Sequence, residues 1–254
     1  MGEPLRTWTE ADGRLLRLRL SRPKANLIDA AMIAALDAAL ARHGGDQLGA
    51  VLLDAEGPHF SFGASVEEHL PAQCAAMLAG LHGLVVRMIE FPVPLLVAVR
   101  GQCLGGGLEV ALAGHLLFVA PDAALGQPEM KLGVFAPAAS CLLPELIGPQ
   151  RALDLLVSGR SVTGAEAAAM GIACEAATDP EHAALAYFEE QLRPKSASSL
   201  RHAVKAARLD YVARVKDKIR AVERLYLEEL MATHDAVAGL EAFIAKRPPQ
   251  WLHR

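Results

Sequence analysis

Residues Gly101 to Glu109 read Gly-Gln-Cys-Leu-Gly-Gly-Gly-Leu-Glu and join an apolar strand pattern to an apolar helix pattern. The strand pattern is Leu95 to Val99, an aliphatic run typical of a buried strand. Consecutive glycines let the backbone approach a ligand closely, and they leave the first amides of the following helix unpaired. Such amides, with the helix dipole behind them, stabilise an oxyanion. This stretch therefore predicts a strand–loop–helix unit that binds a polarised oxygen.

Two glutamates are candidates for acid/base chemistry. Glu109 lies inside the apolar run Leu108 to Ala113, where an ionised carboxylate is costly unless it is paired or faces a cleft. Glu129 follows Gly126-Gln127-Pro128 in a loop that the proline constrains. The alternatives are that Glu109 lies on the wet face of an amphipathic helix and that Glu129 is simply exposed. Two carboxylates beside a pocket of free amides are what proton transfer around a carbonyl requires.

Strand and helix patterns alternate on both sides of this unit over roughly the first 190 residues, which predicts an α/β layered fold with parallel strands. From 196 to 246 the pattern is almost continuously helical and contains no strand candidate. We therefore expect a core over residues 1–193 and a helical region over residues 194–254 that packs on a neighbouring subunit. The expected strands are 16–20, 50–53, 95–99 and 116–120, and the expected helices begin after the N-cap Asp29, near Met77 and at the capping box Thr163–Glu166.

Charge and hydropathy exclude several classes of protein. The net charge of −4 argues against a nucleic-acid binder that relies on a global basic field. The most apolar stretch, 93–117, is interrupted by Arg100, Gln102, Glu109 and His115, so we expect no membrane span. The polar N-terminus has no apolar segment of the secretory type, and we expect a cytoplasmic protein.

Other kinds of site find no support. The sequence has no GxSxG, HExxH or Walker glycine–lysine motif, and no GxGxxG follows the first strand. Four cysteines lie far apart without a CxxC pair, so we expect reduced core residues and neither a disulfide nor a metal site. The cysteines are Cys74, Cys103, Cys141 and Cys174, and five scattered histidines expected to be surface or structural residues are His43, His59, His69, His82 and His115.

Three segments together resemble the crotonase (enoyl-CoA hydratase/isomerase) superfamily. Gly101 to Glu109 resembles the family signature G-x-A-x-G-G-G-x-E. Phe60 to Ser65 resembles F-C-A-G-A-D, with serine in place of the aspartate. Leu125 to Glu129 resembles F-G-Q-P-E, with leucine in place of the phenylalanine. The resemblance extends over nearly the whole chain, and it implies an α/β fold with a spiral ββα core, a C-terminal helical trimerisation region, and a homo-oligomer that is a trimer or a dimer of trimers.

The resemblance also implies the site. It implies that the backbone NH groups of Ala64 and Gly106 hold the thioester oxygen, while Glu109 and Glu129 are the two acid/base carboxylates of a hydratase. Isomerases usually keep only one of them, so the pair favours hydration of an acyl-CoA thioester, with no cofactor beyond the coenzyme A of the substrate. Further residues expected to contact the substrate or its CoA are Lys24, Phe62, Ser65, Gly105, Pro137, and Phe243 and Lys246 from a neighbouring subunit's C-terminal helix.

One segment departs from the common hydratase pattern. After Gly133, hydratases typically read x-P-G-A-G-G-T-Q-R, whereas Val134 to Cys141 reads Val-Phe-Ala-Pro-Ala-Ala-Ser-Cys. Proline and alanines in place of glycines remove a backbone donor and should add bulk near the acyl pocket. This segment and Phe60 to Leu70 are similar to hydratases of cyclohexa-1,5-diene-1-carbonyl-CoA in anaerobic aromatic (benzoyl-CoA) degradation, which add water in a 1,4 sense. The sequence thus predicts a lyase that hydrates a conjugated enoyl or dienoyl thioester of this kind.

Two alternatives remain at this point. One is a general short-chain enoyl-CoA hydratase. The other is a crotonase-fold protein that binds without catalysis, for example to RNA, through a basic helical stretch that includes Arg201, Lys205 and Arg208. The interleaved acids Asp210 and Asp217 favour a solvated helix face over such a binding surface.

Overall fold

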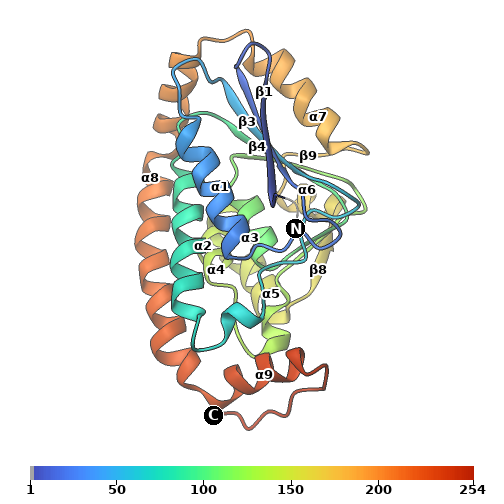
Figure 1. The fold of residues 1–254 in the computed structure, drawn as a ribbon, viewed down its shortest axis with the longest axis vertical. Helices are drawn as coiled ribbons and strands as arrows, with labels where there is room; N and C mark the ends of the chain where they lie inside the picture. The colour runs from blue at the N-terminus through green and yellow to red at the C-terminus, as the bar shows by residue number, and fades with distance from the viewer. Residues whose placement is uncertain (1–2) are drawn as a thin grey trace.

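Aliphatic runs form the inner strands of a six-stranded sheet in the computed structural model, which describes residues 3–254 (Figure 1). The strand order is β1-β2-β3-β4-β6-β9. Neighbours from β2 to β9 pair in parallel, as the alternating pattern predicted, whereas β1 is antiparallel to β2. The strands are β1 (Leu5–Glu10), β2 (Leu15–Leu20), β3 (Ala50–Ala55), β4 (Leu95–Val99), β6 (Leu116–Val119) and β9 (Glu175–Ala176).

A second sheet of three short strands was not predicted, and it builds the region around the glycine-rich stretch. It consists of β5 (Gln102–Leu104), β7 (Ala124–Gly126) and β8 (Ser161–Thr163), in the order β5-β7-β8. Immediately after β5, the amide of Gly105 donates to the carbonyl of Gly126 at 2.9 Å. The segment that carries Glu129 is thereby held beside the start of the helix that carries Glu109.

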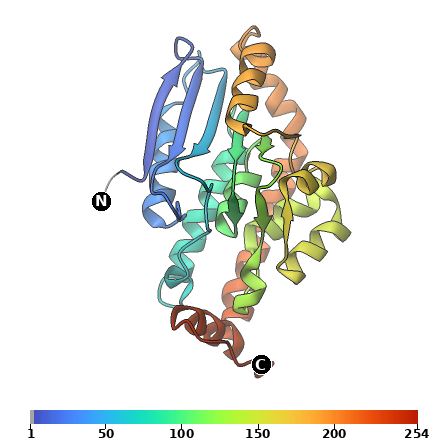
Figure 2. The same ribbon diagram turned by 90° about the vertical axis from the view of Figure 1, so that its right-hand side faces the viewer.

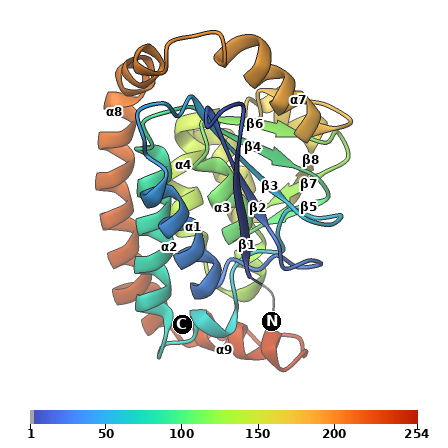
Figure 3. The ribbon, with the colours of Figure 1, turned by 45° about the horizontal axis from the view of Figure 1, so that its top comes forward.

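Helices cover both faces of the large sheet, and the side chains of each strand alternate between them. On β3, Val51 and Leu53 face the core beneath α1 and α2, whereas Leu52 packs on the opposite side with residues of α7. Figure 3 shows α1 and α2 between the sheet and α8, with α7 beyond the other face. The helices up to this point are α1 (Ala30–Arg42), α2 (Cys74–Ile89), α3 (Gly106–Leu112), α4 (Pro137–Ile147), α5 (Pro149–Ser158), α6 (Gly164–Met170) and α7 (Pro180–Tyr187).

Two helix starts predicted from capping residues are confirmed. The side chain of Asp29 accepts a hydrogen bond from the amide of Met32 at 2.9 Å at the start of α1. At the start of α6, Thr163 and Glu166 form a reciprocal capping box. In both cases a side chain pairs with a backbone amide that the first helical turn leaves without a partner.

The C-terminal part of the described chain is helical, as predicted. The long helix α8 (Ala197–Arg224) lies along α2 and α4, and a break at Thr233 precedes α9 (His234–Ile244). Figure 2 shows α9 at the opposite end of the molecule from α7. The boundary at residue 193 stays a prediction, because α8 packs on helices of the core.

The cysteines follow the prediction with one exception. Cys74, Cys103 and Cys141 are buried, but Cys174 is exposed, because it lies at the surface just before the short edge strand β9. None of the helices in residues 3–254 combines the length and the apolar character that a membrane span requires.

Candidate active site

A cavity of about 310 Å³ lies where four segments far apart in the sequence meet. The loop before α2, the start of α3, the turn 128–132 and the helix α9 each contribute to its wall. The wall is mostly apolar and includes two carboxylates, a histidine and a lysine. The lining residues are Phe62, Gly63, Ala64, Val66, His69, Leu78, Leu81, Gly105, Gly106, Glu109, Pro128, Glu129, Lys131, Leu132, Val134, Pro137, Leu240 and Phe243.

The amides of Ala64 and Gly106 lie next to each other in this wall. A Cβ atom placed on Gly106 would be 3.2 Å from the amide nitrogen of Ala64 and 3.0 Å from its Cβ, so the two backbones are in close contact. Neither amide donates a hydrogen bond within residues 3–254. The pair is therefore available to an oxygen of a ligand.

The short strand β5 fixes this arrangement. Ser61 forms a bridge with Cys103, and the amide of Leu104 donates to the carbonyl of Ser61 at 3.0 Å. Gly63 follows with φ +110°, a conformation that favours glycine, and it turns the chain so that Ala64 faces Gly106. The sequence pattern identified these glycines, but the bridge that aligns them is a tertiary contact.

Glu109 is buried, with 2% of its surface exposed, so it does not lie on a wet helix face. One of its carboxylate oxygens accepts a hydrogen bond from the amide of Ala139 at 2.9 Å. Burial raises the pKa of Glu109, and the amide of Ala139 and the nearby His82 partly oppose this rise. The first turn of α4 thus holds the carboxylate in place at the inner wall of the cavity.

Glu129 also faces the cavity and is not a freely exposed loop residue. A Cβ atom on Gly105 would lie 2.6 Å from its Oε1, so only glycine leaves room for this carboxylate. With its amide nitrogen turned toward the carboxylate, the buried Gln127 donates to both oxygens of Glu129 at 3.1 Å. Burial, together with the negative charge of Glu109, raises the pKa of Glu129 to about 8.

The segment that departs from the hydratase pattern, 134–141, contributes fewer residues to the cavity wall than expected. Pro137 lines the cavity, and its contact with the substrate stays a prediction. Ala138 and Ala139 are fully buried and do not line it, so the prediction that they add bulk to the acyl pocket is wrong. Both lie in the first turn of α4, where their methyl groups pack in the core and the amide of Ala139 binds Glu109.

The remaining expected contacts divide into two groups. Phe62, Gly105 and Phe243 line the cavity, and Phe243 does so from α9 of the same chain, whereas the expectation brought it from a neighbouring subunit. Ser65 does not line the cavity, because its hydroxyl donates to Glu67. Lys24 and Lys246 are exposed residues outside the lining of this cavity.

The sequence interpretation missed several residues of the wall. His69 and Lys131 carried no signal except their closeness in sequence to Ala64 and Glu129. Leu78 and Leu81 lie on the apolar face predicted for α2, and that pattern could not distinguish a cavity wall from the core. His82, buried on the same helix, binds Glu223 through Nδ1 at 2.5 Å.

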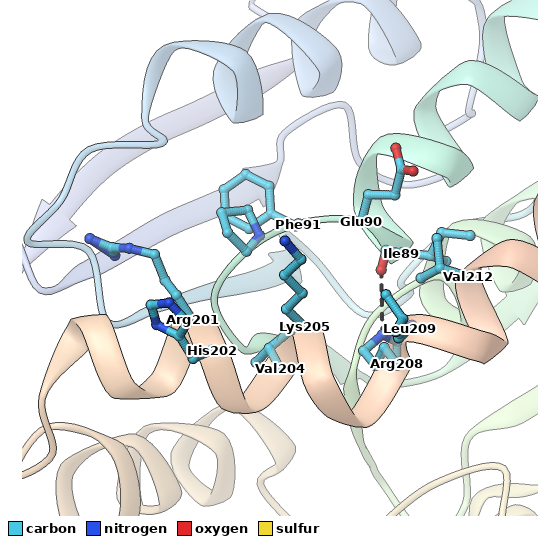
Figure 4. A pocket seen from close by; sticks show the side chains of 11 residues that line it. Ile89, Glu90, Phe91, Arg201, His202, Val204, Lys205, Arg208, Leu209 and Val212 are labelled. Atoms are coloured by element: carbon cyan, nitrogen blue, oxygen red, sulfur yellow. Dashed lines mark hydrogen bonds between the residues drawn. The ribbon is translucent and has the colours of Figure 1, made fainter.

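A larger cavity, of about 540 Å³, lies elsewhere, between α8 and the end of α2 (Figure 4). Basic residues of α8, including Arg201 and Lys205, lie beside apolar ones, and Arg208 donates to the carbonyl of Ile89. Glu90 is its single carboxylate, so it lacks the paired acids and paired amides of the smaller cavity. Within residues 3–254 no cluster of three or more His, Cys, Asp or Glu side chains could hold a metal ion.

Comparison with known proteins agrees with this architecture. The enoyl-CoA hydratase/isomerase family model matches residues 10–254. A protein of Thauera aromatica named cyclohexa-1,5-dienecarbonyl-CoA hydratase is 65% identical over 252 residues, which cover 99% of this chain and 98% of that protein. A probable enoyl-CoA hydratase of Bacillus subtilis (strain 168) is 31% identical over 246 residues, covering 92% of this chain and 93% of that one.

Solved structures show the same fold. The crystal structure of an enoyl-CoA hydratase from Mycobacterium avium subsp. paratuberculosis K-10 matches with a TM-score of 0.84 at 21% identity over 98% of both chains. The predicted fold class, an α/β fold of the crotonase type with a helical C-terminal region, is confirmed. On the family match and the identity to these relatives, the chain belongs to the enoyl-CoA hydratase/isomerase family.

Proposed function

We propose that this chain hydrates cyclohexa-1,5-diene-1-carbonyl-CoA by 1,4-addition of water in the degradation of aromatic compounds. The observation that carries the proposal is that two carboxylates and two free amides face one cavity. The name of the Thauera aromatica relative, at 65% identity over 99% of this chain, supports the choice of the ring diene.

The thioester oxygen would bind to the amides of Ala64 and Gly106. When water adds to the carbon β to the thioester, electron density moves onto that oxygen. Two fixed amides stabilise this charge without reorganisation, and one such donor typically contributes about 10² to 10³ in rate. The close contact between the two backbones suits a single oxygen shared by both amides.

The two glutamates would exchange protons with water and substrate. One ionised carboxylate removes a proton from the water as its oxygen bonds to the ring carbon β to the thioester. The other carboxyl group, which is protonated, gives a proton to the far end of the diene. The remaining double bond then lies between the carbon that received the hydroxyl group and the carbon that received the proton. Because the pKa of Glu129 is raised to about 8 beside Glu109, the pair can hold one proton near neutral pH.

The shape of the acyl pocket supports a flat ring. Leu78 and Leu81 of α2 form one part of its apolar wall, and Val134 and Pro137 form another. Pro137 is the first residue of α4 and has a fixed φ, so this part of the wall is stiff. A rigid apolar wall favours a planar ring over a flexible chain.

The proposal also covers the oligomeric state of the protein and its location in the cell. We expect it to act in the cytoplasm without a cofactor, the coenzyme A being part of the substrate. Leu153 and Val157 of α5, with 60% and 57% of their surface exposed, support self-association as a trimer or a dimer of trimers. Lys24 and Lys246, both exposed, would reach the CoA phosphates.

A direct comparison of substrates tests the proposal. Hydration of the ring dienoyl-CoA and of crotonyl-CoA is followed by ultraviolet absorbance under identical conditions, and kcat/KM is compared. We expect a clear preference for the ring diene. Crotonyl-CoA turning over as fast or faster would indicate a general enoyl-CoA hydratase, and binding without turnover of either would indicate a non-catalytic protein.

A further inference from the structure

His69 lines the same cavity as the two carboxylates, and its ring orientation is defined by a backbone contact. Its Nδ1 lies 2.7 Å from the carbonyl oxygen of Ser65. A carbonyl oxygen only accepts hydrogen bonds, so Nδ1 carries the hydrogen. In the neutral ring, Nε2 then presents a lone pair and acts as an acceptor.

The surroundings of this ring favour its neutral form. Burial lowers the pKa of His69 below its ordinary value, and the bond to Ser65 opposes this only in part. Within residues 3–254, Nε2 has no hydrogen-bond partner. A lone pair held at the cavity wall without a partner suits a ligand that offers a hydroxyl hydrogen.

The anchor of His69 is close to the proposed thioester site. Ser65, whose carbonyl holds the ring, directly follows Ala64, whose amide is one of the free pair. The turn that ends at His69 (Glu67–His69) packs against α9, which closes this side of the cavity. The imidazole is therefore fixed relative to the point where the acyl group would enter.

We propose that Nε2 of His69 accepts a hydrogen bond from the attacking water and from the hydroxyl group that this water becomes on the ring. This inference rests on the proposed hydration reaction. His69 orients the water but does not take its proton, because its pKa is lowered while that of Glu129 is raised to about 8. The proton passes to a carboxylate, and the imidazole stays neutral throughout.

Binding of two CoA thioesters isolates this contact. One is the hydroxylated product, 6-hydroxycyclohex-1-ene-1-carbonyl-CoA, and the other is cyclohex-1-ene-1-carbonyl-CoA, which lacks the hydroxyl. Calorimetry gives their affinities for the wild type, His69→Leu and His69→Gln. We expect His69→Leu to lower the affinity for the hydroxylated ligand about tenfold, the usual contribution of one hydrogen bond, and to leave the other nearly unchanged.

The glutamine variant separates this role from a structural one. The side-chain oxygen of glutamine can replace Nε2 as an acceptor, so His69→Gln should restore most of the selective affinity. An equal loss for both ligands, or no loss for either, would overturn the inference. Wild-type turnover of the ring diene is measured in parallel: its absence would refute the proposed function, whereas a selective effect of His69→Leu would still establish the contact.

Discussion

Glu109 and Glu129 reach one cavity from different elements, and each is held by an amide donor. Ala139 binds the first through its backbone, and Gln127 binds the second through its side chain. These contacts position the carboxylates, while burial raises the pKa of both. Both features are needed if one group is to accept a proton while the other donates one.

Replacing either carboxylate by its amide should remove catalysis but not binding. We expect Glu109→Gln and Glu129→Gln each to lower kcat by about 10² to 10⁴, the usual contribution of a general acid or base. The dissociation constant of the product thioester should change little, because the amide keeps the size of the side chain. Glu190→Gln, which changes an exposed glutamate outside the cavity lining, is the matched control. Turnover within a factor of three of wild type in either variant would reject that assignment.

The raised pKa of Glu129 has a consequence for stability. The pKa of its carboxyl group rises from an ordinary value of 4.5 to about 8 in the folded protein. A pKa that is higher in the folded than in the unfolded protein gives a stabilising contribution that is complete when the pH is below the unfolded pKa. This contribution is lost as the pH rises to the folded pKa. As the pH is raised from about 4.5 to about 8, we therefore expect the Tm of wild type to decrease relative to that of Glu129→Gln. A Tm difference that is constant over this range would contradict the shift.

The proposed oxyanion donor at Gly106 can be tested apart from its steric surroundings. Gly106→Ala keeps the amide but places a Cβ atom 3.0 Å from that of Ala64, while Gly106→Pro adds bulk and removes the amide. Proline is tolerated at the first position of a helix, where α3 begins. We expect kcat of the proline variant to fall about 10² to 10³ below that of the alanine variant. Equal rates in the two folded variants would show that the thioester oxygen binds elsewhere.

Among the secondary-structure elements, β2, β3 and α7 are joined by a buried ion network. Asp54 of β3, 2% exposed, accepts hydrogen bonds from Arg17 at 2.7 Å and from Arg19 at 2.6 Å. Glu181 at the start of α7 completes the network, 2.6 Å from Arg17. Such a network fixes how α7 covers its face of the sheet.

Removing Asp54 should destabilise the fold without altering the chemistry. Asp54→Ala removes the buried carboxylate that Arg17 and Arg19 share. Because Glu10 and Glu181 still pair with Arg17, we expect a loss of about 3 kcal/mol in the free energy of unfolding, the lower end of the usual cost of breaking a buried pair. Denaturant unfolding measures this loss, and kcat of the folded protein should stay near that of wild type. Asp154→Ala, which breaks the exposed pair with Arg160, is the control and should resemble wild type. A stable Asp54→Ala protein would contradict the structural role of the network.

Some of the strands could be predicted from the sequence and others could not. Strands of four or more apolar residues, such as β3 and β4, were predicted because their pattern is local. The three-residue strands β5 and β7 are too short to show a period, and they form only because their partners lie alongside. β1 was missed because only Leu5 of its six residues is buried, as expected for an edge strand.

Prediction of the site residues was limited in the same way, because contacts between distant segments leave no local sequence pattern. The glycines and both glutamates stand in recognisable local patterns, so the sequence could identify them. His69 could not be identified, because a single histidine has no pattern and its role depends on the turn that brings it to the carbonyl of Ser65. The alanines at 138 and 139 were misplaced because sequence alone did not show which way the first turn of α4 faces.

At the scale of the whole molecule, the core and the C-terminal helical region meet at the cavity. The loop with Ala64, the helix start at Gly106 and the turn with Glu129 meet through the small sheet, and α9 returns from the C-terminal region to place Phe243 at the cavity. The core therefore positions the two carboxylates, while the helical region adds Phe243 to the wall of the cavity. This division fits a reaction in which an acyl group is enclosed and its CoA remains outside.

The positions of the hydroxyl group and of the added hydrogen distinguish 1,4-hydration of the ring diene from 1,2-hydration. The ring dienoyl-CoA is converted in D₂O, and the product is examined by NMR spectroscopy. For 1,4-addition we expect a hydroxyl group on the carbon β to the thioester and one deuterium at the far end of the former diene, so that the two flank the remaining double bond. Hydroxyl and deuterium on adjacent carbons would contradict it.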